Sequence, residues 1–283
     1  MSLYQLHDHP DLVAPSLVAA LDGWVDAGSA ASSAVATLVG DGELVATFDT
    51  DALFDYRSRR PSLEIVDGRL AELTWPHLTL RRTRIGERDL LVLSGQEPDD
   101  RWRGLCDAVV ELAVGFEVAE WISLGAIPAA VPHTRTVNVL GTATRPDLIR
   151  GGVEAGPAGV MRVPAAALSV LEMAASAAGI AAVGYFAQVP HYVTGPYPAA
   201  AVELLRALGR HLDAEPPLGA LPEEARQLRL RLDAATALDE TSRSYVERLE
   251  AMVDEARLPS GDDLISEIER FLHDRGSEGS QRS

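Results

Sequence analysis

The sequence predicts a three-layer α/β/α fold, in which helices cover both faces of a mainly parallel, mixed sheet, followed by a C-terminal helical extension. Two observations carry this prediction. Short apolar runs, typical of buried strands, alternate with segments long enough to form helices, and this order favours βαβ crossovers. Two of the helical segments, 31–40 and 164–179, are rich in Ala and Ser, so each could lie close against a sheet.

Two hairpins are expected between the apolar strands. Asp67 and Gly68 separate alternating runs within 62–76, which is a strong signal for a β-hairpin. The stretch 77–95 is typical of a further hairpin that ends in a buried strand. We expect these hairpins to add antiparallel strands at one side of the sheet. The other expected strands are 16–22, 44–51, a strand pair within 120–141, and 180–189.

Helical spacing of apolar side chains predicts helices over 98–118, 164–179 and 198–214. With the last of these, the α/β/α core domain is expected to span 1–215. The Pro-rich segment 215–222 then marks a change of character.

The expected helical extension spans 216–274. It contains a helix over 223–257 and a last helix that opens at Ser260, and the tail 275–283 is expected to be disordered. The extension either packs on its own domain or serves as an arm for oligomerisation or partner binding. The apolar stripe on a helix does not by itself indicate which surface it contacts.

Composition excludes several classes of function. The net charge of −17 repels phosphate backbones, so we expect no nucleic-acid partner. All 25 basic residues are arginine, which removes lysine Schiff bases, pyridoxal-phosphate anchorage and a P-loop lysine. The single cysteine, Cys106, forms no internal disulfide and is typical of a small core residue. No cofactor and no metal site is expected.

No apolar run reaches the length of a membrane span, and the first residues carry no basic, apolar leader. We therefore expect no membrane association and a cytoplasmic location.

Polar side chains follow the expected strands repeatedly, and two strands end in a Pro-His pair. Pro132 and His133 stop one apolar run, and Pro190 and His191 stop another. Because ligands collect beyond the carboxyl ends of parallel strands, we expect both turns to face one crevice. The candidate catalytic residues are Glu97, His133 and His191, and the candidate ligand-binding residues are Asp26, Arg57, Arg60, Trp102, Arg135 and Tyr192.

Each candidate also has a structural interpretation. His133 could act as a general base beside an anion-binding Arg135, or the histidine of either Pro-His pair could simply belong to a strand-ending turn. Glu97 could transfer protons, or favour the N-terminus of the helix that follows it. Asp26 is expected to cap the helix at 31–40. Arg57 and Arg60 could hold an anion or form a solvated basic turn.

Several motifs, in this order, carry a resemblance to a known family: GWVDAGSA, DYRSRRP, GQEPDDRW, LGAIPAAVPHTR, GPAGV and VPHY. Together they resemble the proteasome-assembly-chaperone family, and more narrowly its single-chain actinobacterial branch, over roughly residues 3–213. The resemblance implies an α/β/α domain like that of nucleoside phosphorylases and related hydrolases. It also implies a homo-oligomer, with a trimer favoured.

Two functions follow as expectations. The first is an oligomeric, chaperone-like protein that binds other proteins. Family chaperones engage the proteasome through a hydrophobic-Tyr-X tail, whereas this sequence ends in SEGSQRS, so docking on the proteasome by that route is not expected. The alternative is a small-molecule hydrolase or phosphorylase-like enzyme, with a pocket formed at the carboxyl ends of the strands.

Overall fold

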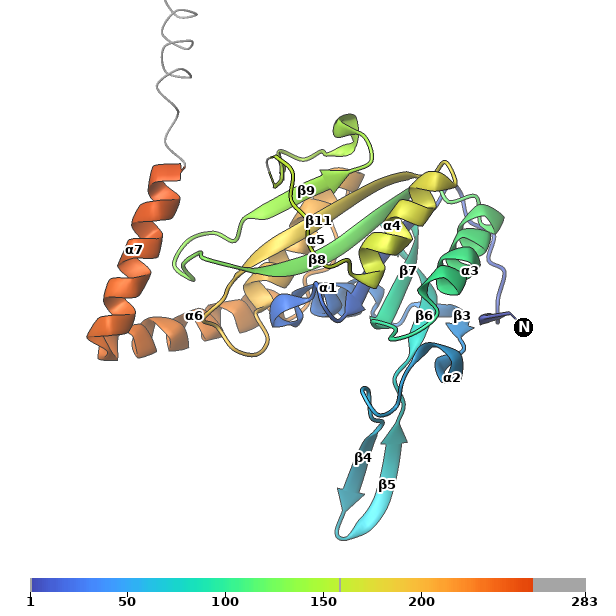
Figure 1. Cartoon of the computed structure of the whole chain (residues 1–283), viewed down its shortest axis with the longest axis horizontal. Coiled ribbons are helices and arrows are strands. Elements are labelled where there is room, and N and C mark those ends of the chain that lie inside the picture. Colours follow the sequence, from blue (N-terminus) through green and yellow to red (C-terminus); the bar gives the residue numbers. More distant parts are fainter. Residues whose placement is uncertain (1, 158, 257–283) are drawn as a thin grey trace, which may run out of the picture. The chain divides into compact units, whose positions relative to one another are not determined.

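A nine-stranded sheet forms the centre of the molecule in the computed structural model, which describes residues 2–157 and 159–256 (Figure 1). Its strands run in the order β1-β3-β6-β7-β2-β8-β11-β9-β10. The strands are β1 (Tyr4–Leu6), β2 (Ser16–Asp22), β3 (Glu43–Phe48), β6 (Leu78–Ile85), β7 (Arg88–Gln96), β8 (Glu120–Ala129), β9 (Val139–Ala143), β10 (Glu154–Ala155) and β11 (Ala181–Pro190).

The four middle strands of the sheet, β7, β2, β8 and β11, are parallel to one another, and β1, β3 and β6 form an antiparallel flank. On the other flank β9 is antiparallel to β11, and β10 is parallel to β9. The carboxyl ends of the four parallel strands therefore lie along one edge, where the sequence predicts polar turns.

Helices cover both faces of the sheet, which confirms the predicted three layers. Helices α1 (Ala30–Val39) and α5 (Pro198–Leu212) pack on one face, and α3 (Trp102–Gly115) and α4 (Ala167–Ala177) pack on the other. Successive residues of β2 point to opposite faces, so Val18 belongs to the first core and Leu17 to the second. Short helical turns complete this unit: η1 (Ala27–Ser29), α2 (Thr50–Leu53) and η2 (Pro146–Leu148).

Two expectations about strand pairing are wrong. The strand pair within 120–141 does not form, because β11 lies between β8 and β9 and hydrogen-bonds to both. The hairpin within 62–76 forms, but not at the side of the main sheet. Its strands β4 (Ser62–Val66) and β5 (Arg69–Thr74) make a separate two-stranded sheet that projects from the core (Figure 1).

The described chain divides into two compact units after Leu232, rather than at the expected boundary after residue 215. The reason is that α6 (Leu221–Leu238) begins in the first core, where Leu221 is buried and Leu228 packs against it. The single helix expected over 223–257 is two helices, because the helical conformation is interrupted at Asp239, before α7 (Glu240–Ala256). The last helix and the tail expected after Ser260 lie outside the described residues.

Candidate functional site

The two Pro-His turns lie side by side, as the sequence predicts. Strands β8 and β11 pair in parallel with Pro190 opposite Ala129, so both turns leave the sheet at the same place. The hydroxyl Oη of Tyr192 lies 2.7 Å from the backbone nitrogen of His133 and 2.8 Å from its Nδ1. The second turn therefore holds the first through one phenol group.

These two hydrogen bonds hold the His133 turn in place. The backbone N–H of His133 donates to Oη of Tyr192, and a second hydrogen bond joins Oη to Nδ1 of the ring. The donor in this second bond depends on the tautomer of the imidazole. His133 is also buried, with 3% of its surface exposed, so its Nδ1 is engaged inside the turn.

A cavity of about 330 Å³ opens beside His133, lined by α5, the first part of α6 and the turn after β8. Its lining includes four arginines and one carboxylate. Arg229 donates to the carbonyl oxygen of His133 over 2.9 Å, which joins the turn to α6. The charged lining residues are Arg135, Arg206, Arg226, Arg229 and Glu203.

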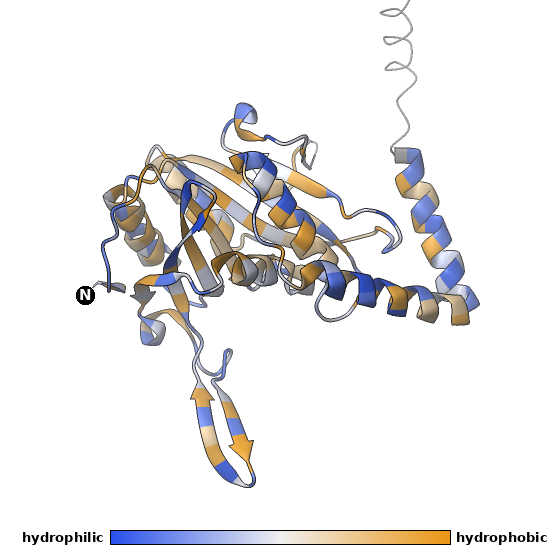
Figure 2. Ribbon diagram, turned by 180° about the vertical axis from the view of Figure 1, so that it is seen from behind, coloured by the Kyte–Doolittle hydropathy of each residue, from blue (hydrophilic) through white to orange (hydrophobic). Residues whose placement is uncertain are grey.

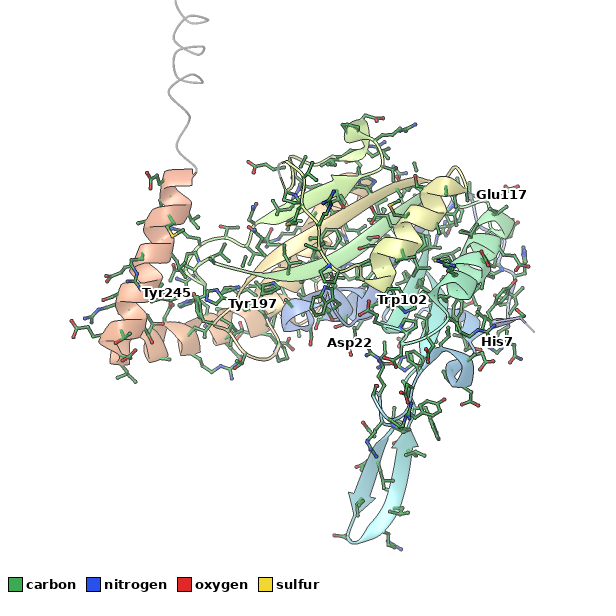
Figure 3. The ribbon with its side chains drawn as sticks, in the orientation of Figure 1. His7, Asp22, Trp102, Glu117, Tyr197 and Tyr245 are labelled. Atoms are coloured by element: carbon green, nitrogen blue, oxygen red, sulfur yellow. The ribbon has the colours of Figure 1, made fainter. Side chains whose placement is uncertain are left out.

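Part of this positive charge is compensated inside the cavity wall and beside it. Arg206 pairs with Glu203 at 2.6 Å, and Arg226 pairs with Glu223 at the same distance. Tyr197, which precedes α5 and is labelled in Figure 3, also lines the cavity. Burial raises its pKa to about 12, so it remains a neutral phenol. The cavity wall therefore combines arginine N–H donors, a carboxylate and a neutral phenol.

Glu97 lies on the other face of the sheet and takes no part in this cavity. Its Oε1 accepts a hydrogen bond from the backbone of Ala167 over 2.7 Å, and its Oε2 accepts one from Trp24 over 2.7 Å. Ala167 is the first residue of α4, so Glu97 favours a helix N-terminus, but of α4 rather than of the helix that follows it in sequence. A Cβ on Gly23 would overlap the Glu97 carboxylate, which explains the glycine there.

Asp26 caps α1, as expected. Its Oδ1 accepts from the backbone nitrogens of Ala31 and Ser32, over 2.7 and 3.3 Å. The carboxyl group is buried and its Oδ2 has no hydrogen-bond partner among the described residues. Burial raises the pKa of Asp26, and the hydrogen bonds from Ser32 and Ala31 only partly oppose this effect.

The remaining candidates lie apart from the His133 cavity. His191 is exposed, and its Nδ1 lies 3.0 Å from the carbonyl oxygen of Ala129. Trp102 donates from Nε1 to the carbonyl oxygen of Pro98 over 2.7 Å, which closes the start of α3. Arg57 forms two 3.0 Å hydrogen bonds with the carboxylate of Asp55, and Arg60 is exposed. Figure 3 shows Trp102 and Asp22 near one end of the sheet and Glu117 near the opposite end.

A buried polar network at the amino ends of the strands has no counterpart in the sequence predictions. Glu120 accepts from Ser16 Oγ over 2.8 Å and contacts His211 Nε2 at 3.1 Å, and His211 Nδ1 lies 2.7 Å from Tyr185 Oη. Burial alone would raise the pKa of Glu120, but the bonds from His211 and Ser16 outweigh it and hold the pKa below its ordinary value. The residues of this network are far apart in the sequence, so no local motif indicates that they meet.

Within residues 2–157 and 159–256, no group of three or more His, Cys, Asp and Glu side chains is placed to hold a metal ion. None of the helices in this described part is long and apolar enough to cross a membrane.

The model of the PAC2 family matches residues 20–236, which is most of the chain. This chain belongs to the PAC2 family. The match covers the end of β2, the parallel strands β7, β8 and β11, both Pro-His turns and nearly all of α6. It thereby confirms the family resemblance that the ordered motifs predict.

Solved structures give the same assignment for this PAC2 protein. A Corynebacterium glutamicum protein of unknown function is 34% identical, with 90% of this chain and 97% of that chain covered at a TM-score of 0.84. A PAC2 family protein from Streptomyces avermitilis is 37% identical, with 82% and 99% covered at 0.73. A proteasome-assembly chaperone homologue from Mycobacterium tuberculosis, Rv2125, is 36% identical, with 82% and 99% covered at 0.73. No curated protein matches the chain.

Proposed function

We propose that this PAC2 protein is a cytoplasmic, homo-oligomeric protein of the chaperone type, which acts by binding proteins rather than by turning over a substrate. The family resemblance favours three subunits. The observation that carries the proposal is the β4–β5 hairpin, a separate two-stranded sheet whose apolar side chains are exposed.

A two-stranded sheet by itself is at best marginally stable in water. Here every residue of both strands is exposed, so the core does not stabilise the hairpin through burial. Six large apolar side chains of the hairpin and the residue after it share this exposure: Leu63, Ile65, Val66, Leu70, Leu73 and Trp75. Contiguous exposed apolar surface of this kind marks a site of interaction with another protein.

The relatives support the same proposal. One relative, described as a proteasome-assembly chaperone homologue, is 36% identical over an alignment that covers 82% of this chain.

Site-specific photo-crosslinking in the native cells tests this proposal. A benzophenone amino acid in place of Leu70 should yield a covalent adduct with a protein that mass spectrometry identifies. The same amino acid in place of Glu64, on the polar side of the hairpin, serves as the matched control and should yield little of that adduct. If neither position gives a protein adduct, the hairpin does not bind proteins and the proposal is wrong.

The arginine-lined cavity favours a second candidate function, the binding of a small anion. Arg135 and Arg229 lie beside His133, but Glu97, the other expected proton-transfer group, lies on the opposite face of the sheet. The geometry therefore supports binding better than hydrolysis or phosphorolysis. Titration calorimetry with inorganic phosphate should give a dissociation constant about tenfold weaker for Arg135→Gln than for the parent, with Arg57→Gln unchanged. Absence of binding to the parent protein excludes phosphate as the ligand.

A further inference from the structure

A second cavity, about 820 Å³ in volume, lies on the α4 face of the sheet beneath the segment that joins β9 to α4. Its floor is formed by side chains of three neighbouring strands, Ile127 of β8, Phe186 of β11 and Leu140 of β9. No described residue of its lining carries a charge. We call this the uncharged cavity.

Large apolar side chains stand exposed at the uncharged cavity. Trp24 is 65% exposed, and Met161 and Val163 expose more than half of their surface. The backbone N–H of Trp24 donates a hydrogen bond to Glu97, which holds the backbone at this exposed ring in place. A solvent-exposed Trp beside an apolar hollow is typical of the buried centre of a protein interface.

The β4–β5 hairpin presents the complementary shape and chemistry. Leu63 lies opposite Leu73, and Ile65 lies opposite Leu70, so four aliphatic side chains share one face of the hairpin. The other face pairs Glu64 with Glu72, and like charges directly opposite each other destabilise a sheet. Figure 2 shows both apolar and polar residues on each strand. The hairpin therefore has one apolar face to cover and little stability of its own.

We propose that the apolar face of the β4–β5 hairpin of one copy of this chain docks in the uncharged cavity of a second copy. This proposal rests on the proposed protein-binding function and names the partner of the hairpin. The hairpin of one copy inserts into the uncharged cavity of the other. Leu70 of the first copy then contacts the surface that Trp24 and Met161 of the second copy form.

Charge favours a second copy as the occupant. The chain carries a net charge of −17, so two copies repel each other over most of their surface. Self-association is then confined to surfaces without charge, and the uncharged cavity and the apolar hairpin face are two such surfaces. A partner recognised by charge would find no ionic contact in this cavity.

The two surfaces lie apart within one copy of the chain. The hairpin leads into β6, whereas Phe186 of the cavity floor lies on β11, four strand spacings away in the sheet. At about 4.8 Å per spacing, this separation is about 19 Å. The hairpin also projects away from the sheet, as Figure 1 shows. This placement favours a contact between copies over one within a single chain.

A contact between two different surfaces has a consequence for the assembly. Each copy both donates a hairpin and offers a cavity, so the contact closes as a reciprocal pair or as a ring where its rotation permits, and otherwise continues as an open filament. A closed assembly of this kind leaves no unpaired hairpin, which agrees with the favoured trimer as well as with a dimer.

Disulfide crosslinking between two purified variants tests the docking directly. In a Cys106→Ala background, Leu70→Cys protein is mixed with Met161→Cys protein of a different tagged mass and oxidised mildly. The expected product is the mixed disulfide, in excess over either homodimer, while Glu64→Cys mixed with Met161→Cys gives little of it. Absence of the mixed disulfide, or predominance of the Leu70→Cys homodimer, overturns the proposed docking.

Light scattering supplies a second measurement that does not depend on cysteine chemistry. Leu70→Glu and Met161→Glu change exposed residues and should keep the fold, as circular dichroism can verify, but each should lower the molar mass of the assembly to that of a single chain. An unchanged mass overturns the docking. If photo-crosslinking at Leu70 in cells yields only a different protein, the protein-binding function stands and the docking between copies is wrong. If it yields no adduct, both are wrong.

Discussion

The hydroxyl of Tyr192 bonds both the backbone nitrogen and the Nδ1 of His133, at 2.7 and 2.8 Å, although 59 positions separate the two residues in sequence. One phenol thus joins the turns that end two neighbouring parallel strands. Because Arg229 also donates to the carbonyl of His133, three segments of the chain meet at this histidine.

Tyr192→Phe should destabilise the fold by about 1–3 kcal/mol, because it leaves the buried backbone N–H and the ring Nδ1 of His133 without this partner. Urea unfolding followed by fluorescence measures the change. His191→Ala, which removes an exposed ring from the same turn, is the control and should have a smaller effect. Equal effects would show that the Tyr192–His133 contact contributes little to stability.

Glu97→Gln should destabilise the fold by about 2–3 kcal/mol, because a carboxamide accepts through only one of its two terminal atoms. Both carboxylate oxygens of Glu97 now accept from backbone donors, of Trp24 and Ala167, so the new NH₂ group would face one of these donors. Thermal unfolding measures the loss, with the exposed Glu87→Gln as the control. A variant as stable as the parent would contradict this structural role for Glu97.

Asp26 should make the protein less stable as pH rises through its titration. Burial raises the pKa of Asp26, so the folded state holds this proton more tightly than the unfolded state does. Stability is then highest below the unfolded pKa near 4, falls as pH increases through the folded pKa, and is level above it.

Asp26→Asn removes this component of the pH dependence and keeps an acceptor for the backbone of α1. Free energies of unfolding measured in urea from pH 4 to pH 8 should therefore fall less steeply for Asp26→Asn than for the parent. Asp41→Asn, at an exposed position, should keep the parental slope. Identical slopes for all three proteins would assign the pH dependence to other groups.

His211→Ala should destabilise the fold by about 2 kcal/mol at pH 7, because it removes a partner of Glu120 and of Tyr185. Breaking a fully buried ion pair would cost more stability, but the Glu120 side chain is 20% exposed to solvent. The pKa of Glu120 is lowered, so the stability it contributes is present above the unfolded pKa and is lost as pH falls through the folded pKa.

The difference in free energy of unfolding between His211→Ala and the parent should therefore be smaller at acidic pH. Chemical unfolding at pH 7 and at pH 3.5 measures it. Arg226→Ala, which breaks an exposed ion pair with Glu223, is the matched control and should leave stability nearly unchanged. A constant difference at both pH values would mean that the ionised Glu120 is not what His211 stabilises.

Local pattern was sufficient to predict most of the individual elements. The apolar run at 16–22 is a strand with those bounds, and the Asp67-Gly68 signal marks a hairpin turn. The cap on α1 could also be predicted, because Asp26 lies only five residues before Ala31, whose backbone it binds. In each case the interacting groups are close in sequence.

Partnerships between distant segments could not be predicted in the same way. The structural interpretation of Glu97 placed it at the helix that follows it, but its carboxylate accepts from the first residue of α4, 70 residues later. The runs within 120–141 were expected to pair, but β11 separates them. Nothing near Glu120 in the sequence indicates His211, 91 residues away. Whether the catalytic and ligand-binding candidates act chemically stays a prediction.

The sequence by itself determined the alternation of strands and helices, the polar turns at strand ends and the membership of the PAC2 family, because these depend on side-chain period and on ordered local motifs. Only the tertiary structure decided which turns meet, which face of the sheet each carboxylate occupies and which apolar surfaces stay uncovered. Strand order and helix placement set those distances, and they arise from burial of apolar side chains across the whole domain rather than from any single segment.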